Sequence, residues 1–211
     1  MSDAPKPARP KIIAVANQKG GVGKTTTAIN LGTALTEKGK SVLVVDLDPQ
    51  GNASTGLGVF ADSRGLTTYD LLIEGAELQD VVRETDVEGL WIAPATTDLS
   101  SADIELVNNG ARVFRLRSAL GQLGRLEKPV DYVIVDCPPS LNLLTINAMV
   151  AADSVLVPLQ SEFFALEGLS QLMLSIREVR QTANPRLRIE GVVLTMYDRR
   201  NNLSRQVEDG A

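Results

Sequence analysis

The stretch that decides the fold runs from residue 17 to residue 27 and reads Asn17-Gln18-Lys19-Gly20-Gly21-Val22-Gly23-Lys24-Thr25-Thr26-Thr27. The common phosphate-binding loop has a glycine, four free positions and then Gly-Lys-Ser/Thr. Gly23-Lys24-Thr25 fits the second half of that pattern, whereas Gln18 stands where the first glycine belongs. An additional lysine, Lys19, precedes the pair Gly20-Gly21. One lysine can serve the β- and γ-phosphates of a bound nucleotide, so the second lysine needs a separate explanation.

The segments on both sides of this loop match a strand followed by a helix. Residues 11–16 form a short apolar, partly β-branched run, which is typical of a buried parallel strand. Residues 25–38 carry apolar side chains on one helical face, and Gly39 stands where a helix end favours left-handed backbone. Glycines let successive N–H groups point at phosphate oxygens, and a helix N-terminus adds partial positive charge. The sequence therefore predicts a nucleotide-binding loop, not an ordinary turn with two solvated lysines.

Apolar runs alternate with helical patterns along the whole chain, which indicates an α/β fold. We expect a mostly parallel twisted sheet with helices on both faces, and a single domain over residues 11–211. Further strands are predicted at residues 41–46, 90–93, 131–136, 154–158 and 189–196. Further helices are predicted at residues 66–74, at 98–126 with a break near 108–110, and at 166–181.

The composition is that of a globular protein with a restricted set of catalytic groups. The 211 residues are 44% hydrophobic, the mean hydropathy is near zero, and no run of 18 apolar residues predicts a membrane span. A single cysteine, Cys137, excludes an intrachain disulfide and suits a reducing cytoplasm. Because histidine is absent, Ser-His-Asp catalysis, Cys-His catalysis and His-ligated metals are excluded. The chemistry falls to carboxylates, lysines, hydroxyls, backbone N–H groups and Mg²⁺.

Both ends of the chain differ from its centre. Residues 1–10 are rich in proline and lack a signal-peptide core, so we expect a flexible N-terminal tail there. A helical pattern begins at Asn202 and is cut at residue 211, so we expect the natural C-terminal end to be missing. The formal charge is −5, yet residues 177–211 contain seven arginines and five acids. Counting alone leaves an ordinary solvated surface and a nucleic-acid contact equally open.

Acidic residues at the ends of two predicted strands complete the site. Asp136 ends the apolar strand 131–136, at the edge where open α/β sheets bind ligands, and we expect it to hold Mg²⁺. Asp46 and Asp48 alternate along an extended segment, and Asp48 lies where it can orient a water toward a γ-phosphate. The loop pattern assigns the Thr25 hydroxyl to Mg²⁺ and Thr26 to the α-phosphate.

Three segments together, residues 19–26, 46–52 and 136–140, resemble the deviant Walker A ATPases, a type of P-loop NTPase. The resemblance covers about residues 11–208 and is strongest to the ParA/Soj branch of the MinD/ParA superfamily, which partitions chromosomes or plasmids. It implies that the domain at residues 11–211 is a slow ATPase that converts ATP and water to ADP and phosphate with Mg²⁺. It also implies roles for particular residues: catalysis by Lys19, Lys24 and Asp48, Mg²⁺ binding by Thr25 and Asp136, and ATP binding by Lys19, Gly20, Gly21, Val22, Gly23, Lys24, Thr25 and Thr26.

The same resemblance implies a cycle. Lys19 reaches across a nucleotide-sandwich homodimer to the phosphates of the partner, and the ATP-bound dimer binds DNA without sequence preference. A ParB-type centromere-binding protein then stimulates hydrolysis. The resemblance also implies that the protein is cytoplasmic and is associated with the nucleoid when ATP is bound. The region around residues 194–203 matches the family's basic DNA contact, which makes Arg199, Arg200 and Arg205 the candidate DNA-binding residues.

Other functions share parts of this pattern. A MinD-like membrane-cycling ATPase would need a C-terminal amphipathic helix, and the segment Asp48-Pro49-Gln50-Gly51-Asn52 favours ParA over it. An ATPase that positions a protein cluster would use identical chemistry. An ATPase of the nitrogenase-reductase type needs two cysteines per chain for its cluster, and Cys137 is the only one. A metabolic kinase would need a pocket for an acceptor substrate, for which no motif is found.

Overall fold

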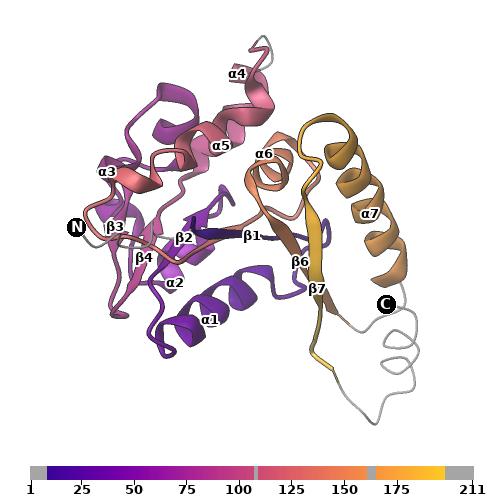
Figure 1. Ribbon diagram of the computed structural model, residues 1–211, viewed down its shortest axis with the longest axis horizontal. Coiled ribbons are helices and arrows are strands. Elements are labelled where there is room, and N and C mark those ends of the chain that lie inside the picture. The colour runs from indigo at the N-terminus through magenta and orange to yellow at the C-terminus, as the bar shows by residue number, and fades with distance from the viewer. Residues whose placement is uncertain (1–8, 107–108, 161–164, 198–211) are drawn as a thin grey trace, which may run out of the picture.

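A mostly parallel β-sheet forms the centre of the computed structural model, which describes residues 9–106, 109–160 and 165–197 (Figure 1). Within these ranges the sheet has seven strands in the order β3-β4-β2-β5-β1-β6-β7. The strands are β1 (Lys11–Val15), β2 (Val42–Asp46), β3 (Arg83–Glu84), β4 (Leu90–Ala93), β5 (Tyr132–Asp136), β6 (Ser154–Gln160) and β7 (Arg188–Thr195). Among these described strands, only β3 pairs in the antiparallel direction, with β4. The predicted α/β class is confirmed.

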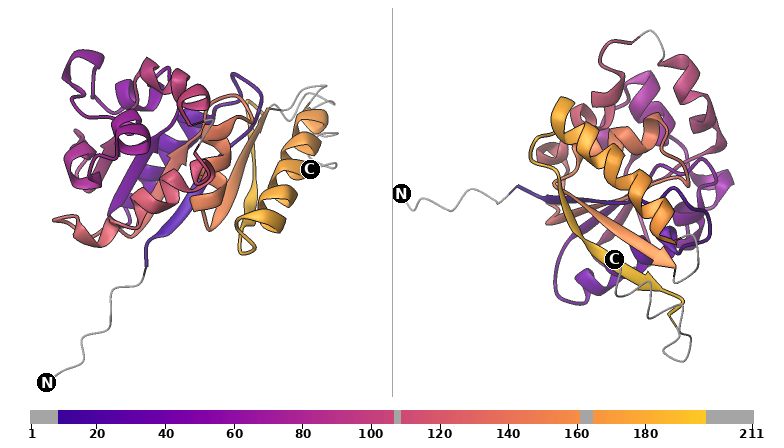
Figure 2. Two further views of the ribbon diagram at one scale, coloured as in Figure 1. Left: turned by 90° about the horizontal axis from the view of Figure 1, so that it is seen from above. Right: turned by 90° about the vertical axis from the view of Figure 1, so that its right-hand side faces the viewer.

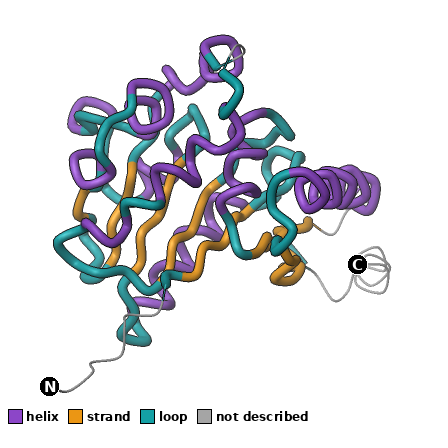
Figure 3. The backbone as a smooth tube through the Cα atoms, turned by 45° about the horizontal axis from the view of Figure 1, so that its top comes forward, coloured by secondary structure: helices purple, strands orange, loops and turns teal. Residues whose placement is uncertain are grey.

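Helices cover both faces of the sheet, as the views in Figure 2 and Figure 3 show. In the described part of the chain they are α1 (Lys24–Thr36), α2 (Asn52–Gly56), α3 (Leu78–Val81), α4 (Ala102–Glu105), α5 (Arg115–Leu120), α6 (Leu143–Ala151) and α7 (Ala165–Thr182). Single helical turns occur between them: η1 (Ala61–Ser63), η2 (Asp70–Glu74), η3 (Thr97–Ser101), η4 (Arg112–Phe114) and η5 (Leu123–Arg125). The expected layers, helix on sheet on helix, are therefore present.

Strand β2 shows how the sequence builds these layers. Val42 and Val44 belong to the apolar core that α1 and α2 share with one face of the sheet. Leu43 and Val45 belong to the core on the other face, which includes buried side chains of α5, α6 and α7. Because a strand between two helical layers buries every side chain, β2 is apolar at each of these positions.

The register of the strands gathers their carboxyl ends at one edge. Asp46 at the end of β2 is opposite Asp136 at the end of β5, and Val15 at the end of β1 is opposite the same Asp136. The phosphate loop leaves β1 at this edge and leads into α1. The fold therefore places both acid-containing segments next to the loop, as expected for ligand binding in an open α/β sheet.

The predicted strands agree with the structure to within two residues at each end. The exception that sequence patterns missed is β3, whose two residues are too short to give a periodic signal. Helix α6 was also not predicted, because seven of its nine residues are buried and it has little polar face. Helices α1 and α7 match the predicted ranges 25–38 and 166–181 closely.

One helix prediction is nearly correct and another needs correction. The predicted helix 66–74 begins at residue 68 in the structure: residues 68 and 69 are helical and continue into the π-helical turn at Asp70–Glu74, and the Leu71 amide donates to the Thr67 carbonyl. The Thr67 amide and hydroxyl donate to the Asp70 carboxylate and so cap the start of this helix. The predicted helix 98–126 is divided into short segments from η3 to η5, and α5 ends where Gly121 follows.

Some predictions fall on residues outside the described ranges. These are the expected tail at residues 1–10, except residues 9 and 10, the helical pattern from Asn202, and the candidate residues Arg199, Arg200 and Arg205. Among the described helices, none is both long and apolar enough to cross a membrane.

Candidate nucleotide-binding site

The phosphate loop has the backbone geometry that its glycines predict. Gly21 and Gly23 have φ angles of 75° and 83°, in the left-handed region that favours glycine. Gly23 is the N-cap of α1 and offers no side chain to its first N–H groups. Those donors and the positive end of the helix dipole therefore face the same point, which suits a phosphate.

Two strands on the same side of the sheet hold this loop in place. The buried Asn17 side chain donates to the Pro158 carbonyl of β6 at 2.8 Å and accepts from the Lys19 amide at 3.1 Å. At the other end of the loop, the Thr195 hydroxyl of β7 donates to the Val22 carbonyl at 2.9 Å. The sequence analysis gave neither Asn17 nor Thr195 a role, because both act through contacts that are distant in sequence.

Lys24 points into the loop. Its ammonium donates to the main-chain carbonyl of Lys19 at 2.7 Å, and its side chain is 6% exposed. Burial lowers the pKa of Lys24, while the neighbouring Asp136, Cys137 and Asp48 act in the opposite direction. The predicted phosphate-binding lysine and both predicted functional carboxylates are thus brought together.

Asp46 has a structural environment. Its carboxylate accepts from the Asp48 amide at 3.1 Å, and from the Ser54 amide and hydroxyl at 2.9 Å and 2.7 Å. Burial raises the pKa of Asp46 to about 6, although the hydrogen bonds from Ser54 and the Asp48 amide favour the ionised form. These bonds fix the segment after β2, and so they set where Asp48 begins its turn.

Asp136 is the opposite case. Within the described part of the chain, neither of its buried carboxylate oxygens has a hydrogen-bond partner. Burial, followed by the charge of Asp46, raises the pKa of Asp136 to about 7. The Thr25 hydroxyl and the Lys24 ammonium favour the ionised form, but Thr25 does not meet hydrogen-bond geometry. A buried carboxylate without a partner is costly, so Asp136 suits a bound cation.

The chain supplies only part of a magnesium shell. Among the described residues, no group of three or more Asp, Glu, Cys or His side chains could hold a metal ion by itself. Thr25 and Asp136 fit a site that takes its remaining oxygen ligands from nucleotide phosphates and water, which is the usual arrangement for Mg²⁺.

Asp48 lies at the rim of this cluster. It is 8% exposed, and its carboxylate accepts from the Gln50 amide at 3.0 Å. The Gly51 amide donates to the Asp48 carbonyl at 2.8 Å and closes the turn. Asp48 is therefore held beside Lys24 and Asp136 by its own loop. Lys19 borders the same loop, where its amide donates to Asn17 and its carbonyl accepts from Lys24.

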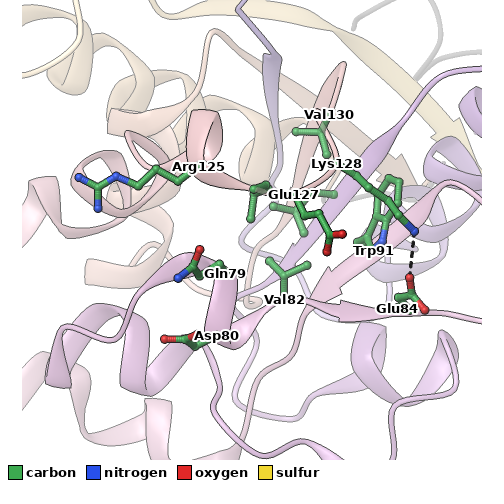
Figure 4. A pocket seen from close by; sticks show the side chains of 11 residues that line it. Gln79, Asp80, Val82, Glu84, Trp91, Arg125, Glu127, Lys128 and Val130 are labelled. Carbon is green, nitrogen blue, oxygen red and sulfur yellow. Dashed lines mark hydrogen bonds and ion pairs between the residues drawn. The ribbon is translucent and has the colours of Figure 1, made fainter.

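A separate cavity of about 370 Å³ lies at the opposite edge of the sheet, near the amino ends of β2 and β4 (Figure 4). The Lys128 ammonium lies 3.1 Å from a Glu84 carboxylate oxygen and 5.6 Å from the centre of the Trp91 ring. None of the candidate nucleotide-site residues lines this cavity, so it takes no part in the site at the carboxyl ends of the strands.

Comparisons with known proteins agree with this geometry. A family model described as an AAA domain matches residues 10–189. The chromosome partitioning protein ParA of Caulobacter vibrioides is 59% identical over 197 residues, which cover 93% of this chain and 73% of that protein. The sporulation initiation inhibitor protein Soj of Bacillus subtilis is 53% identical over 93% of this chain and 77% of its own length.

A solved structure shows the same fold with a ligand. Cobyrinic acid a,c-diamide synthase from Mycobacterium smegmatis, solved with bound ADP and magnesium, superposes with a TM-score of 0.89 at 42% identity and covers 95% of this chain and 80% of that one. The family match spans most of the chain, and the relatives of highest identity reported above are ParA and Soj. The chain therefore belongs to the ParA/Soj family of deviant Walker A ATPases.

Proposed function

We propose that this chain is a Mg²⁺-dependent ATPase that dimerises with ATP, binds DNA without sequence preference and drives DNA segregation with a ParB-type partner. The observation that carries the ATPase is the cluster of Lys24, Asp48 and the unpartnered Asp136 at the mouth of the phosphate loop. The identity of 59% to a chromosome partitioning protein supports segregation as the process.

ATP binding uses groups that already converge. The N–H groups at the start of α1 and the left-handed glycines surround the place for phosphate oxygens. Lys24 exchanges its hydrogen bond to the Lys19 carbonyl for one to a phosphate oxygen. Thr25 and Asp136 would hold Mg²⁺, which would supply neutralisation of phosphate charge when it is bound.

Hydrolysis needs a water that is aligned with the γ-phosphate. Phosphoryl transfer depends mainly on positioning and on charge stabilisation, so the protein group required is one that orients the water. Asp48 is the carboxylate available for this step, since Asp46 is bound to Ser54 and Asp136 faces the cation position. The water attacks phosphorus, the bond to the β-phosphate oxygen breaks, and ADP and phosphate leave.

Dimerisation gives Lys19 its function. Lys24 accounts for the lysine that each chain needs for its own nucleotide, so we assign the Lys19 side chain to the phosphates bound by the partner. The two lysines would then act on one nucleotide from different subunits, which makes closure of the homodimer depend on ATP.

DNA binding is the part of the proposal that rests most on the family. Arg199, Arg200 and Arg205 are its candidate residues. Residues 177–211, which include these candidates, contain seven arginines and five acids. This local excess of positive charge in a chain of net charge −5 supports contact with a phosphate backbone. We place the protein in the cytoplasm, on the nucleoid while ATP is bound.

Co-sedimentation of the full chain with DNA tests the proposal. The expected result is binding with ATP but not with ADP or without nucleotide, and a steep loss of binding as salt is raised. Liposomes tested beside the DNA distinguish the MinD-like alternative, for which lipid and not DNA would retain the protein. Binding of neither, with ATP hydrolysis intact, would favour an ATPase that positions a protein cluster.

Charge reversal locates the contact. Arg199→Glu combined with Arg200→Glu should abolish DNA retention and leave ATP-dependent dimerisation intact. Arg177→Glu combined with Arg180→Glu is the matched control, because it makes the same charge change on the exposed face of α7. Equal loss in both variants would show that overall charge and not a local contact holds the DNA.

A further inference from the structure

Arg64 is a buried arginine without an acidic partner in the described part of the chain. It follows η1, is 5% exposed, and donates four hydrogen bonds to uncharged acceptors. The guanidinium reaches the carbonyls of Val59 at 3.2 Å, Ala95 at 2.6 Å and Gly51 at 3.1 Å, and the Thr55 hydroxyl at 2.9 Å. A buried charge is costly unless it is paired or fully hydrogen-bonded, so these four bonds are what retains it.

Two of these acceptors, Gly51 and Thr55, lie in the segment that directly follows Asp48. Gly51 ends the turn that begins at Asp48, and its amide donates to the Asp48 carbonyl at 2.8 Å. Thr55 lies in α2, which starts directly after Gly51. The Ala95 amide in turn donates to the Ser54 hydroxyl at 3.0 Å. The guanidinium thus connects the turn after β2 to the segment after β4.

Gly51 and Arg64 fit each other closely. A Cβ atom on Gly51 would lie 2.3 Å from Nη1 of Arg64, and the φ angle of Gly51 is 63°. Any side chain at position 51 would displace the guanidinium as well as strain the backbone. The turn is therefore shaped around the arginine, and the two residues share one function.

We infer that Arg64 is a positioning residue for Asp48, which it holds through Gly51 in the place from which Asp48 orients the attacking water. This inference rests on the proposed role of Asp48 in hydrolysis. Arg64 makes no hydrogen bond to residues 17–27 within the described structure, so it acts on the hydrolysis step and not on nucleotide affinity. Displacements of about 1 Å at such a group lower a rate by roughly a hundredfold.

The test measures the rate of ATP hydrolysis and the affinity for Mg-ATP in variants of the full chain. Arg64→Met should lower the single-turnover rate of ATP hydrolysis by roughly tenfold to a hundredfold and change the dissociation constant for Mg-ATP by less than about threefold. Arg64→Lys keeps the charge but loses the planar fork of the guanidinium. Its rate of ATP hydrolysis should therefore lie between those of the native chain and Arg64→Met. Arg115→Met is the matched control: Arg115 also donates to two carbonyls, those of Leu72 and Ile73, but to nothing near Asp48.

Each outcome decides the inference. It is overturned if folded Arg64→Met hydrolyses ATP at the unchanged rate, or if affinity and rate fall together and in parallel with thermal stability. Where Arg64→Met fails to fold, Arg64→Lys and Gly51→Ala give the same comparison, since the added methyl group displaces the guanidinium without removing it. Asp48→Ala separates the two levels: if it hydrolyses ATP normally, the proposed role of Asp48 fails, and if it alone is inactive, only the inference about Arg64 fails.

Discussion

Asp46 and Asp136 are opposite each other in neighbouring strands and yet have opposite environments. Asp46 receives three hydrogen bonds, whereas neither oxygen of Asp136 has a partner among the described residues. The first carboxylate stabilises the folded loop, and the second keeps its bonding capacity for a ligand. Asp46 therefore supports the fold, and Asp136 is available to a ligand.

The raised pKa of Asp136 predicts that this residue lowers the stability of the folded chain by an amount that depends on pH. Its pKa is about 7 in the folded chain, against an ordinary value of 3.8, so the unfolded chain releases this proton first. Between about pH 4 and pH 7 the contribution of Asp136 to stability therefore falls as pH rises. Asp136→Asn removes the titration, and the nucleotide-free variant should melt several degrees above the native chain at pH 8 and lose that advantage toward pH 5.

Melting curves across this pH range check the prediction, with Asp46→Asn as the matched variant. Asp46→Asn should lower stability, because an amide N–H₂ would face the Ser54 donors. Mg-ATP should raise the melting temperature of the native chain more than that of Asp136→Asn. An Asp136→Asn advantage that is absent at pH 8, or independent of pH, would contradict the assigned environment.

Sequence reasoning found the residues whose chemistry is local. Lys24, Asp48 and Asp136 follow from a loop motif and from acids at strand ends, and the structure brings them together. It did not find Asn17 or Arg64, because their partners lie 141 residues and up to 31 residues away along the chain. Side chains that support a site are recognised by contacts that only the folded chain creates.

At the scale of elements, β7 is the strand that connects the far side of the sheet to the phosphate loop. It pairs in parallel with β6, with an irregular register between Val155 and Leu156. Its last residue, Thr195, bonds the Val22 carbonyl, and a Cβ on Gly23 would lie 3.5 Å from the Thr195 methyl. The end of β7 therefore packs against the loop as well as bonding to it.

Thr195→Val tests the contact between the end of β7 and the phosphate loop. Valine keeps the shape but removes the hydroxyl, which leaves the Val22 carbonyl without its donor. Loss of about 1 kcal/mol of loop stability should weaken Mg-ATP binding by roughly fivefold. Equilibrium binding of a fluorescent ATP analogue measures it, and Thr182→Val is the matched control, since the Thr182 hydroxyl bonds the Glu178 carbonyl on α7. Equal affinities in all three chains would show that the loop does not depend on β7.

The elements also show where patterns stop being informative. Strands buried on both faces have continuous apolar runs, so β2, β4 and β5 were predicted nearly to the residue. The helix predicted at residues 66–74 begins at residue 68, after Thr67, whose amide and hydroxyl donate to the Asp70 carboxylate. The helix predicted at residues 98–126 is instead divided into short segments from η3 to η5, and apolar periodicity cannot show where such a segment breaks.

For the whole molecule, the surplus lysine is the feature that one chain does not explain. The main chain of Lys19 has defined work within the subunit: its amide donates to Asn17 and its carbonyl accepts from Lys24. Neither contact uses the side chain, so truncation at this position leaves both intact. Lys19→Ala therefore keeps these two main-chain bonds, so it can be used to test the side chain for a function between subunits.

Lys19→Ala should bind Mg-ATP with an affinity within about threefold of the native chain and yet fail to dimerise with ATP. The Lys19 bonds to Asn17 and Lys24 come from its main chain, which alanine preserves, whereas closure of the dimer requires a cation against the partner's phosphates. Light scattering after size exclusion, with and without ATP, measures the dimer, and nucleotide titration measures the affinity. Lys24→Ala is the matched control and should lose both. Parallel loss of affinity and dimerisation in Lys19→Ala would show that this lysine contacts the nucleotide of its own subunit.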